Sequence, residues 1–172
     1  MNTSIKTTPQ ERKLGFRVLF LGMFAIGTGQ TLFIAVLPPY ARGLGLSEVQ
    51  VGFIFSLSAL GWMLMSPFWG KRSDYLGRKS IIILGLIIYS ITTILMGVEF
   101  RLNELGVINL STLFGLLILT RGCYGFLGSG AHSASMAYVA DRTTERERSG
   151  VMAVMGSAFA ISGIVAVSYT HL

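Results

Sequence analysis

One arginine interrupts a long apolar stretch, where a charge is costly and can act on a ligand. Apart from Arg121, residues 106–140 contain no Asp, Glu, Lys or Arg. A charged side chain in the middle of a membrane helix costs about 2.5–3.5 kcal/mol on insertion scales, so it persists where it faces a watery cavity or a partner. We interpret Arg121 as part of a substrate or proton pathway. The structural alternative is that Arg121 snorkels to the membrane interface.

Two uncharged polar residues are candidates for the same pathway. Gln30 lies near the centre of the apolar stretch at 16–40, and it can hydrogen-bond a substrate but cannot carry a proton. His132 lies on a neighbouring face of the Arg121 segment and is either a hydrogen-bonded structural residue or a proton or substrate contact. The predicted spans contain no Asp or Glu, so a carboxylate for proton coupling would have to come from outside them.

A second kind of chemistry is predicted in two short charged segments. The first combines glycines and charges between residues 70 and 82, at Gly70, Asp74, Gly77, Arg78 and Lys79. A carboxylate can pair with arginine or stabilise a helix N-terminus, and a glycine lets a neighbouring helix approach closely. The second segment, 141–150, contributes Asp141 and Arg148. If the two segments lie on one side of a membrane they form a charge cluster; the alternative for the second is an ordinary solvated turn.

The elements that carry these residues are predicted to be membrane helices. Hydrophobic residues make up 52% of the 172-residue chain and charged residues 13%, against roughly 25% charged in soluble domains. A bilayer core of about 30 Å needs roughly 20 helical residues, and several uncharged stretches are that long. We predict an all-α bundle whose helices span about 16–40, 49–70, 80–98, 110–140 and 149–167, with short loops at 42–48, 71–79, 99–109 and 141–148.

The basic residues predict the orientation of these helices. Most of the 14 Lys and Arg residues precede the first helix or lie in the loops 71–79 and 141–148, whereas only Arg42 and Arg101 lie in the other two loops. Positive residues are enriched on the cytoplasmic side, so the N-terminus is predicted to be cytoplasmic. The formal charge of +6 is explained by these loops, and a nucleic-acid partner has no support.

Small residues and potential ligands complete the candidates. Gly122 and Gly125, and later Gly156 and Gly163, are predicted to allow close helix packing. No metal site is predicted, because His132 and His171 have no second ligand at metal-binding spacing. Cys123 is the only cysteine, so the chain has no intrachain disulfide.

Three motifs resemble the major facilitator superfamily of transporters. Residues 70–79 resemble its loop between helices 2 and 3, although Arg72 replaces a leucine and Tyr75 a basic residue. Residues 121–125 resemble the Arg-x-x-Gln-Gly pattern of proton-coupled members, with tyrosine at the Gln position. Residues 141–148 resemble its Asp-x(6)-Arg stretch at the cytoplasmic end of helices 4 and 5.

The resemblance implies a fold and an activity. It implies the first five helices of a twelve-helix polytopic bundle that moves small molecules by alternating access, with the missing C-terminal half as partner. The closest branch is the drug:proton antiporters of the bacterial inner (plasma) membrane, which need no cofactor and export drug-like or apolar compounds. In that family the charge cluster ties the two halves together. The five-helix segment is not expected to complete a transport cycle alone, and 167–172 is either a non-native tail or a genuine variant.

Two other functions are weighed against export. A proton symporter or facilitator that imports a sugar, organic acid or other metabolite would share the same helices. An intramembrane enzyme, such as a protease, would need a Ser/His pair in a Gly-x-Ser-Gly setting or two intramembrane aspartates, and residues 128–132 contain no such motif. We therefore predict a transporter and not an enzyme.

Overall fold

The chain forms a bundle of long helices. The computed structural model describes residues 8–170, with side chains for residue 8 and residues 10–164, and this part contains no β-strand. The elements are α1 (Pro9–Gly43), α2 (Glu48–Leu76), α3 (Arg78–Glu104), α4 (Leu110–Cys123), the π-helical segment η1 (Tyr124–Gly128), α5 (Ser129–Asp141) and α6 (Glu145–Thr170). Because α4, η1 and α5 run on without a break, they form one long helix, Leu110–Asp141.

Local signals set where the helices begin. Thr8 and Ser47 each form a capping box, in which the side chain of the cap accepts from the third backbone amide and the third side chain accepts from the cap. Asn109 caps α4 through its side-chain oxygen. Gly77 alone separates α2 from α3, and its φ of 87° is a conformation that residues with a Cβ rarely adopt.

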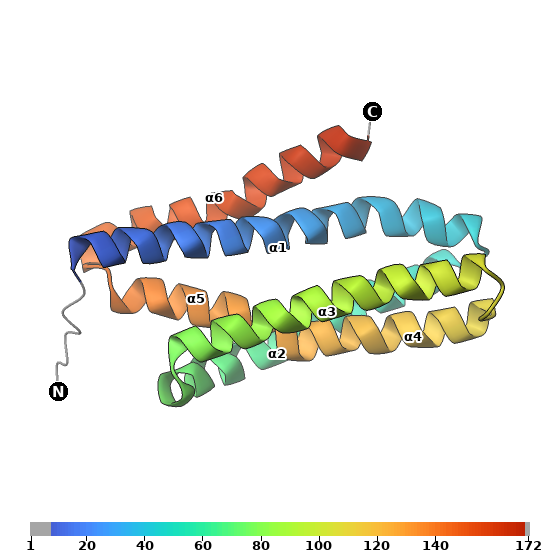
Figure 1. Ribbon diagram of the computed structural model, residues 1–172, viewed down its shortest axis with the longest axis horizontal. Helices are drawn as coiled ribbons and strands as arrows, with labels where there is room; N and C mark the ends of the chain where they lie inside the picture. Colours follow the sequence, from blue (N-terminus) through green and yellow to red (C-terminus); the bar gives the residue numbers. More distant parts are fainter. Residues whose placement is uncertain (1–7, 171–172) are drawn as a thin grey trace.

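The helices are arranged in two groups. Figure 1 shows α6 lying along the first part of α1 and diverging from it towards the C-terminus, and α1 is the main contact of α6. The second group consists of α2, α3 and the long helix Leu110–Asp141, which pack on one another. Two apolar cores hold the bundle together. One includes Leu37, Ile54 and Leu117 near the loops that follow α1 and α3, and the other includes Met23 and Met155 between α1 and α6.

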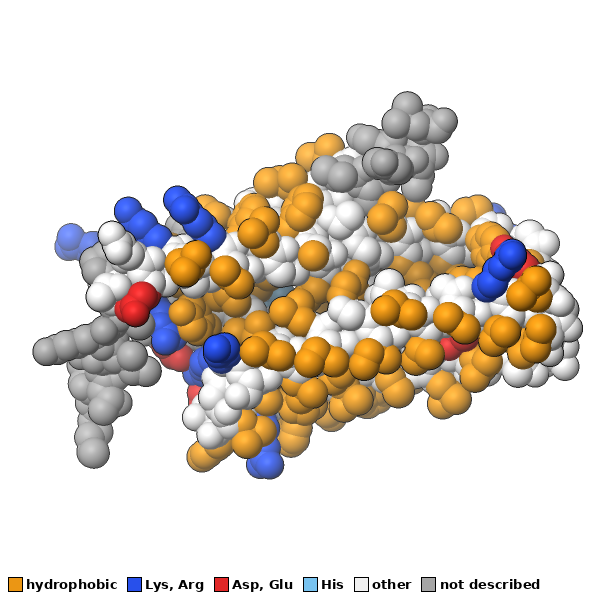
Figure 2. Space-filling model, viewed as in Figure 1, with side chains coloured by type: hydrophobic (Ala, Val, Ile, Leu, Met, Phe, Trp, Pro, Cys, Tyr) orange, Lys and Arg blue, Asp and Glu red, His pale blue; other side chains and the backbone are white. Residues whose placement is uncertain are grey.

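Charge divides the bundle into two ends. We call the end where residues 10–17, 70–79 and 141–148 meet the basic end, and the end where residues 42–48 and 101–109 meet the far end. Figure 2 shows Lys and Arg side chains gathered at the basic end, while apolar side chains cover most of the visible flank. This division follows the spacing of the charged loops along the chain.

The flanks have the composition of a membrane-facing surface. Within residues 8–170, four helices are long and apolar enough to cross a bilayer: Gln10–Gly43, Glu48–Leu76, Arg78–Glu104 and Leu110–Asp141. Many large apolar side chains on them are exposed, including Leu21, Met63 and Ile94, each more than 60% exposed. A soluble protein would bury most of such residues, whereas lipid covers them without penalty. The protein is therefore an all-α membrane protein.

The helices extend beyond the predicted apolar spans, and this shortens the predicted loops, two of them most. The predicted loop 71–79 is reduced to Gly77, because α2 continues through Leu76 and α3 begins at Arg78. The predicted loop 99–109 starts too early, since α3 continues to Glu104. Hydropathy marks the apolar core of a span, whereas the backbone hydrogen bonds of a helix continue into polar sequence. The expectation that the helices contain no acidic residue is therefore wrong for Glu99.

The sequence predicted one uninterrupted helix at 110–140, but the long helix Leu110–Asp141 contains an irregular segment. Residues Tyr124–Gly128 are π-helical. A Cβ at Gly128 would lie 2.7 Å from the ring of Tyr124, so the absent side chain makes room for that ring. The indole nitrogen of Trp69 on α2 donates a hydrogen bond of 2.8 Å to the carbonyl of Phe126 inside this segment. Such segments occur frequently at functional sites.

Close packing at Gly125 leads to a first testable prediction. A Cβ at this position would lie 2.4 Å from the carbonyl oxygen of Ser58 on α2, so the two helix backbones would have to separate. We expect Gly125→Ala to destabilise the chain by about 1–3 kcal/mol, the usual range for overpacking. Thermal unfolding in detergent measures the effect.

Gly115 supplies the matched control for this substitution. It lies on the same helix, and no described atom would come within 4 Å of an added Cβ. Gly115→Ala should leave the melting temperature unchanged or raise it slightly, because alanine favours helix more than glycine does. Equal melting temperatures for the two variants would contradict the packing argument.

Candidate functional site

Arg121 and Gln30, which are far apart in the sequence, meet inside the bundle. The Arg121 guanidinium donates from Nη1 to Gln30 Oε1 at 3.0 Å, which links the long helix Leu110–Asp141 to α1. Arg121 is 5% exposed, and its Nε is buried without a hydrogen-bond partner among the described residues. A snorkelling arginine would end in solvent at a helix terminus. The buried contact with Gln30 therefore favours a place for Arg121 inside the bundle over snorkelling to the membrane interface.

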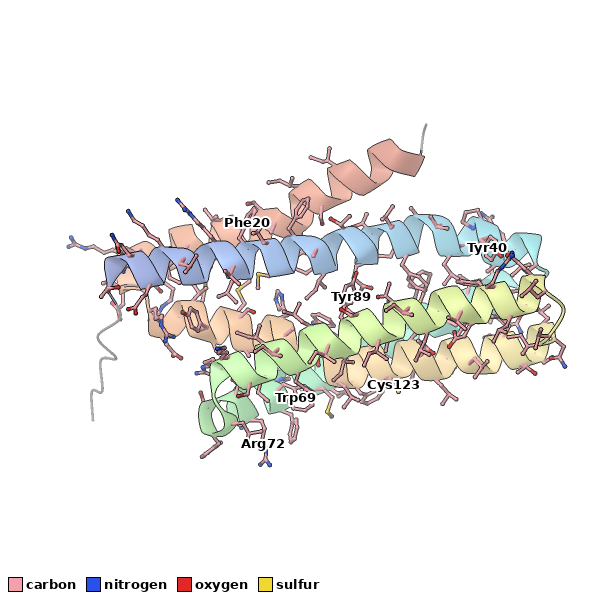
Figure 3. The ribbon with its side chains drawn as sticks, in the orientation of Figure 1. Phe20, Tyr40, Trp69, Arg72, Tyr89 and Cys123 are labelled. Atoms are coloured by element: carbon pink, nitrogen blue, oxygen red, sulfur yellow. The ribbon has the colours of Figure 1, made fainter. Side chains whose placement is uncertain are left out.

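Aromatic rings surround the guanidinium. Its carbon lies 4.1 Å from the ring centre of Phe33 on α1 and 4.9 Å from that of Tyr124. The Tyr124 ring lies 5.7 Å from both Trp62 on α2 and Tyr89 on α3, centre to centre. In Figure 3, Tyr89 points from α3 towards α1, and its hydroxyl donates to a backbone carbonyl there. Aromatic faces stabilise a cation when they are desolvated, so the rings offset part of the cost of burying Arg121.

His132 belongs to the same region but not to the Arg121 contact. Its ring lies 5.8 Å from Trp62 and 5.7 Å from Phe159 on α6, and its Nδ1 is buried without a partner among the residues described. α2, α6 and the long helix thus meet around the His132 imidazole, whose Nδ1 can still form a hydrogen bond. Three sequence candidates, Arg121, Gln30 and His132, are therefore placed in one region, and their roles there stay predictions.

The charged segments meet at the basic end around Arg78. Its Nε donates to Asp141 Oδ2 at 2.9 Å, and its Nη2 pairs with Asp74. Its Nη1 donates to the Gly70 carbonyl at 3.1 Å and to Ser73 Oγ at 2.5 Å. The Arg78 side chain is 18% exposed, whereas the two carboxylates are about half exposed. Arg78 therefore connects the end of α2, the start of α3 and the end of α5.

Other predicted members of this cluster take different positions. Lys79 is exposed and makes no ion pair within the described residues. Arg148 donates to the Ala140 carbonyl at 3.3 Å at the end of α5, and no ion pair joins it to Asp141 among the described residues. No described atom would lie within 4 Å of a Cβ added at Gly70, so its contribution here is its carbonyl oxygen.

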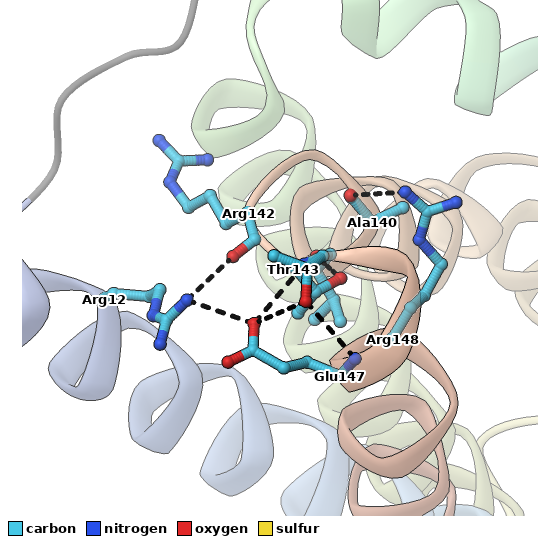
Figure 4. Close-up of polar contacts among 8 residues, drawn as sticks. Arg12, Ala140, Arg142, Thr143, Glu147 and Arg148 are labelled. Atoms are coloured by element: carbon cyan, nitrogen blue, oxygen red, sulfur yellow. Dashed lines mark hydrogen bonds and ion pairs between the residues drawn. The ribbon is translucent and has the colours of Figure 1, made fainter.

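A second polar contact, drawn in Figure 4, joins the start of α1 to the start of α6. Arg12 donates to the Arg142 carbonyl at 3.5 Å and pairs with Glu147 at 3.4 Å. Hydrogen bonds from the backbone and hydroxyl of Thr144, together with the charge of Arg12, hold the pKa of Glu147 below its usual range. Glu147 is therefore ionised at neutral pH and holds α6 to α1 at the basic end.

The four predicted packing glycines differ in their surroundings. Gly125 lies against the α2 backbone, as described above, and a Cβ at Gly122 would be 3.6 Å from Leu57. No described atom lies within 4 Å of a Cβ added at Gly156 or Gly163, so their packing role stays a prediction. For the predicted tail 167–172, residues 171 and 172 lie outside the described part of the chain, and nothing in the rest tests its origin.

Several buried polar residues and contacts were not predicted from the sequence. Ser73, which is 1% exposed, lies within the motif at 70–79, but the motif did not indicate its contact with Arg78. Glu99, which is 6% exposed, belongs to no motif that was recognised and to neither of the two sites. Tyr124 was noted only because it replaces the glutamine of a known pattern, although it is 1% exposed and touches Arg121. A usable signal existed for Glu99, because an acidic residue directly after an apolar run can still be inside the helix.

Comparison with known proteins now gives the family. The profile of the Major Facilitator Superfamily matches residues 19–170, which run from α1 to the end of α6. Multidrug resistance protein 2 of Bacillus subtilis (strain 168) is 30% identical over 161 residues, which cover 94% of this chain and 37% of that protein. Quinolone resistance protein NorA of Staphylococcus aureus is 39% identical over 88 residues, 51% of this chain and 23% of that protein. The chain thus spans well under half the length of these relatives, and it belongs to the Major Facilitator Superfamily.

Proposed function

We propose that the chain is the N-terminal portion of a twelve-helix transporter of the bacterial inner membrane that exports apolar or cationic small molecules in exchange for protons. We refer to the protein that completes this fold with a second half as the full-length transporter. The observation that carries the proposal is the buried Arg121–Gln30 contact among aromatic rings. The names of two relatives, which refer to multidrug and quinolone resistance, support export of drug-like compounds.

The chemistry of the Arg121 region suits such substrates. Trp62 and Tyr89, which are half-buried and pack against Tyr124, carry flat apolar rings of the kind that stack on aromatic compounds and attract organic cations. The unpartnered Nε of Arg121 can donate to an oxygen atom of a substrate.

The basic end supplies a gate in this proposal. Positive residues favour the cytoplasmic side, so the basic end faces the cytoplasm and the N-terminus is inside. Arg78 holds the ends of α2, α3 and α5 together with four acceptors, which makes this end of the five-helix segment rigid. A rigid end can rock as a unit against the second half. Asp74 pairs with Arg78 but is half exposed, so its carboxylate can also make a contact across that interface.

Proton coupling needs a group that can lose its proton. Arg121 is permanently charged and Gln30 does not titrate, so neither carries the proton. Within the described spans, the buried Glu99 and the half-buried His132 are the two candidates that we propose for this exchange. In the proposed cycle Arg121 positions the substrate and stabilises the occupied state, while a titratable side chain takes up the proton.

The proposal is tested with the full-length transporter in cells that lack their own efflux pumps. We expect efflux of a fluorescent cationic dye, and we expect a protonophore to stop it. Uptake of a labelled sugar and of a labelled organic acid is measured in the same cells. Proton-dependent uptake of one of these without dye efflux would contradict export and identify an importing symporter.

A further inference from the structure

A carboxyl group lies buried between α3 and the long helix Leu110–Asp141, towards the far end. Glu99 is 6% exposed, and the hydroxyl of Thr120, itself 7% exposed, donates to Glu99 Oε1. The second oxygen, Oε2, is buried and has no hydrogen-bond partner among the described residues. Neither the Arg78 cluster nor the Arg121 contact uses this group.

The neighbours of Glu99 along both helices are apolar. Met96 precedes it by one turn on α3, and Leu117 precedes Thr120 by one turn on the facing helix. Met96 and Leu117 are both buried members of the apolar core near the far end. A carboxylate in such a setting has little to replace the water that it loses on burial.

The charged and titratable groups of the surrounding helices are engaged elsewhere. Arg121, next to Thr120, donates to Gln30 on α1. Glu104 pairs with Arg101 and accepts from Tyr40 of α1. Arg42 of α1 and Glu48 of α2 pair with each other at the far end. The other charged groups of α1, α2, α3 and the long helix, among them Asp74, Arg78 and Asp141, lie at the basic end. The titratable groups between the two ends of these helices are Tyr89, Cys123, Tyr124 and His132. None of the ion pairs in the described part of the chain includes Glu99.

These surroundings suit a neutral acid and not a carboxylate. A buried carboxylate is stable when a cation or several hydrogen-bond donors surround it, and here one hydroxyl is available. We propose that Glu99 is a proton-binding site, which holds its proton while α3 and the long helix are packed together and releases it to water when their far ends separate. In the release step the O–H bond of the acid breaks, water accepts the proton, and the carboxylate keeps the electron pair.

Only the role of Glu99 in transport rests on the proposed function. A proton held at the far end reports whether α3 and the long helix are packed together there. The site would thus supply a titratable carboxyl within this chain, outside the Arg121 region. Protonation itself can be tested without transport.

Infrared spectroscopy of the 172-residue chain in lipid tests the protonation state. At neutral pH we expect the carbonyl stretch of a protonated carboxylic acid, and we expect Glu99→Gln to remove it. Glu104→Gln is the control, because Glu104 lies five residues on in α3 but its side chain is 42% exposed and ion-paired, so the band should persist. A wild-type chain without this band, or a band that Glu99→Gln leaves unchanged, would overturn the proposal.

Thr120→Val provides a second test that retains the carboxyl. Removing the hydroxyl deletes the hydrogen bond to Oε1, so the band should remain and move to higher frequency. A loss of the band in Thr120→Val would contradict a neutral Glu99, because a more apolar site favours the acid still more. Thr120→Val therefore tests the protonation state of Glu99 even if Glu99→Gln fails to fold.

Transport by the full-length protein separates this inference from the proposed function. If Glu99 binds a coupling proton, Glu99→Gln should flatten the pH dependence of dye efflux, while Glu104→Gln should leave it unchanged. Proton-driven efflux without the Glu99 band would overturn the inference and leave the proposed function standing. The Glu99 band without proton-driven efflux would overturn the proposed function and leave the protonation site standing.

Discussion

Arg121→Ala is expected to reduce proton-driven dye efflux by the full-length transporter at least about tenfold, because a hydrogen bond to a charged group contributes about 1.5–3 kcal/mol and 1.4 kcal/mol corresponds to a factor of ten. The substitution removes the Nη1 contact to Gln30 and leaves the amide oxygen of that residue without its partner. It also removes the cation that lies over Phe33 and Tyr124. Efflux from dye-loaded cells at equal expression measures the effect.

Arg121→Lys tests whether the planar guanidinium matters. Lysine keeps the charge but offers a single compact donor group, so we expect it to restore little activity if both the Gln30 bond and the ring contacts are needed. Arg101→Ala is the control, since Arg101 is an exposed arginine that pairs with Glu104 at the far end. Full activity in Arg121→Ala would show that the buried residue has no role in transport.

Arg78→Ala is expected to have the second large effect, on both stability and transport. The side chain bonds to two carboxylates, to Ser73 Oγ and to the Gly70 carbonyl, so its loss disconnects α2 and α3 from α5 at the basic end. Asp141 and Asp74 are half exposed, which lets water replace part of each contact. We expect lower thermal stability in detergent and lower efflux, with insertion into the membrane unchanged.

A double-mutant cycle shows whether Arg78 acts through Asp141. The coupling between Arg78→Ala and Asp141→Asn should lie within about 0.5–3 kcal/mol, the range for residues in direct contact. Asp74→Asn should impair transport with little effect on stability, since the proposed role of Asp74 is a contact across the interface with the second half. Arg72→Ala is the matched control, because Arg72 is exposed and Figure 3 shows it pointing away from the bundle. Additive effects of the Arg78 and Asp141 substitutions would contradict a shared contact.

Much of the architecture could be predicted because membrane helices follow local rules. Uncharged stretches of about 20 residues identify spans, and the grouping of basic residues identifies the two ends. The cluster at Arg78 was also predictable in outline, since short loops bring residues 70–79 and 141–148 to the same end. What the motif did not indicate is the contact between Ser73 and Arg78, because a serine in a helix usually bonds to its own backbone, and only the position of the Arg78 guanidinium gives Ser73 a second partner.

The sequence by itself determined the helical class, the charged ends and the presence of a costly arginine inside a span, because each depends on residues that are close together in the chain. Only the tertiary structure decided which helix covers which side chain. Gln30 and Arg121 are 91 positions apart, and nothing local indicates that they meet. Glu99 looked like the start of a loop because hydropathy falls there, yet its helix continues and Thr120 of another helix covers it. Burial is a property of the neighbouring helix, and it is burial that turns an ordinary glutamate into a candidate proton site.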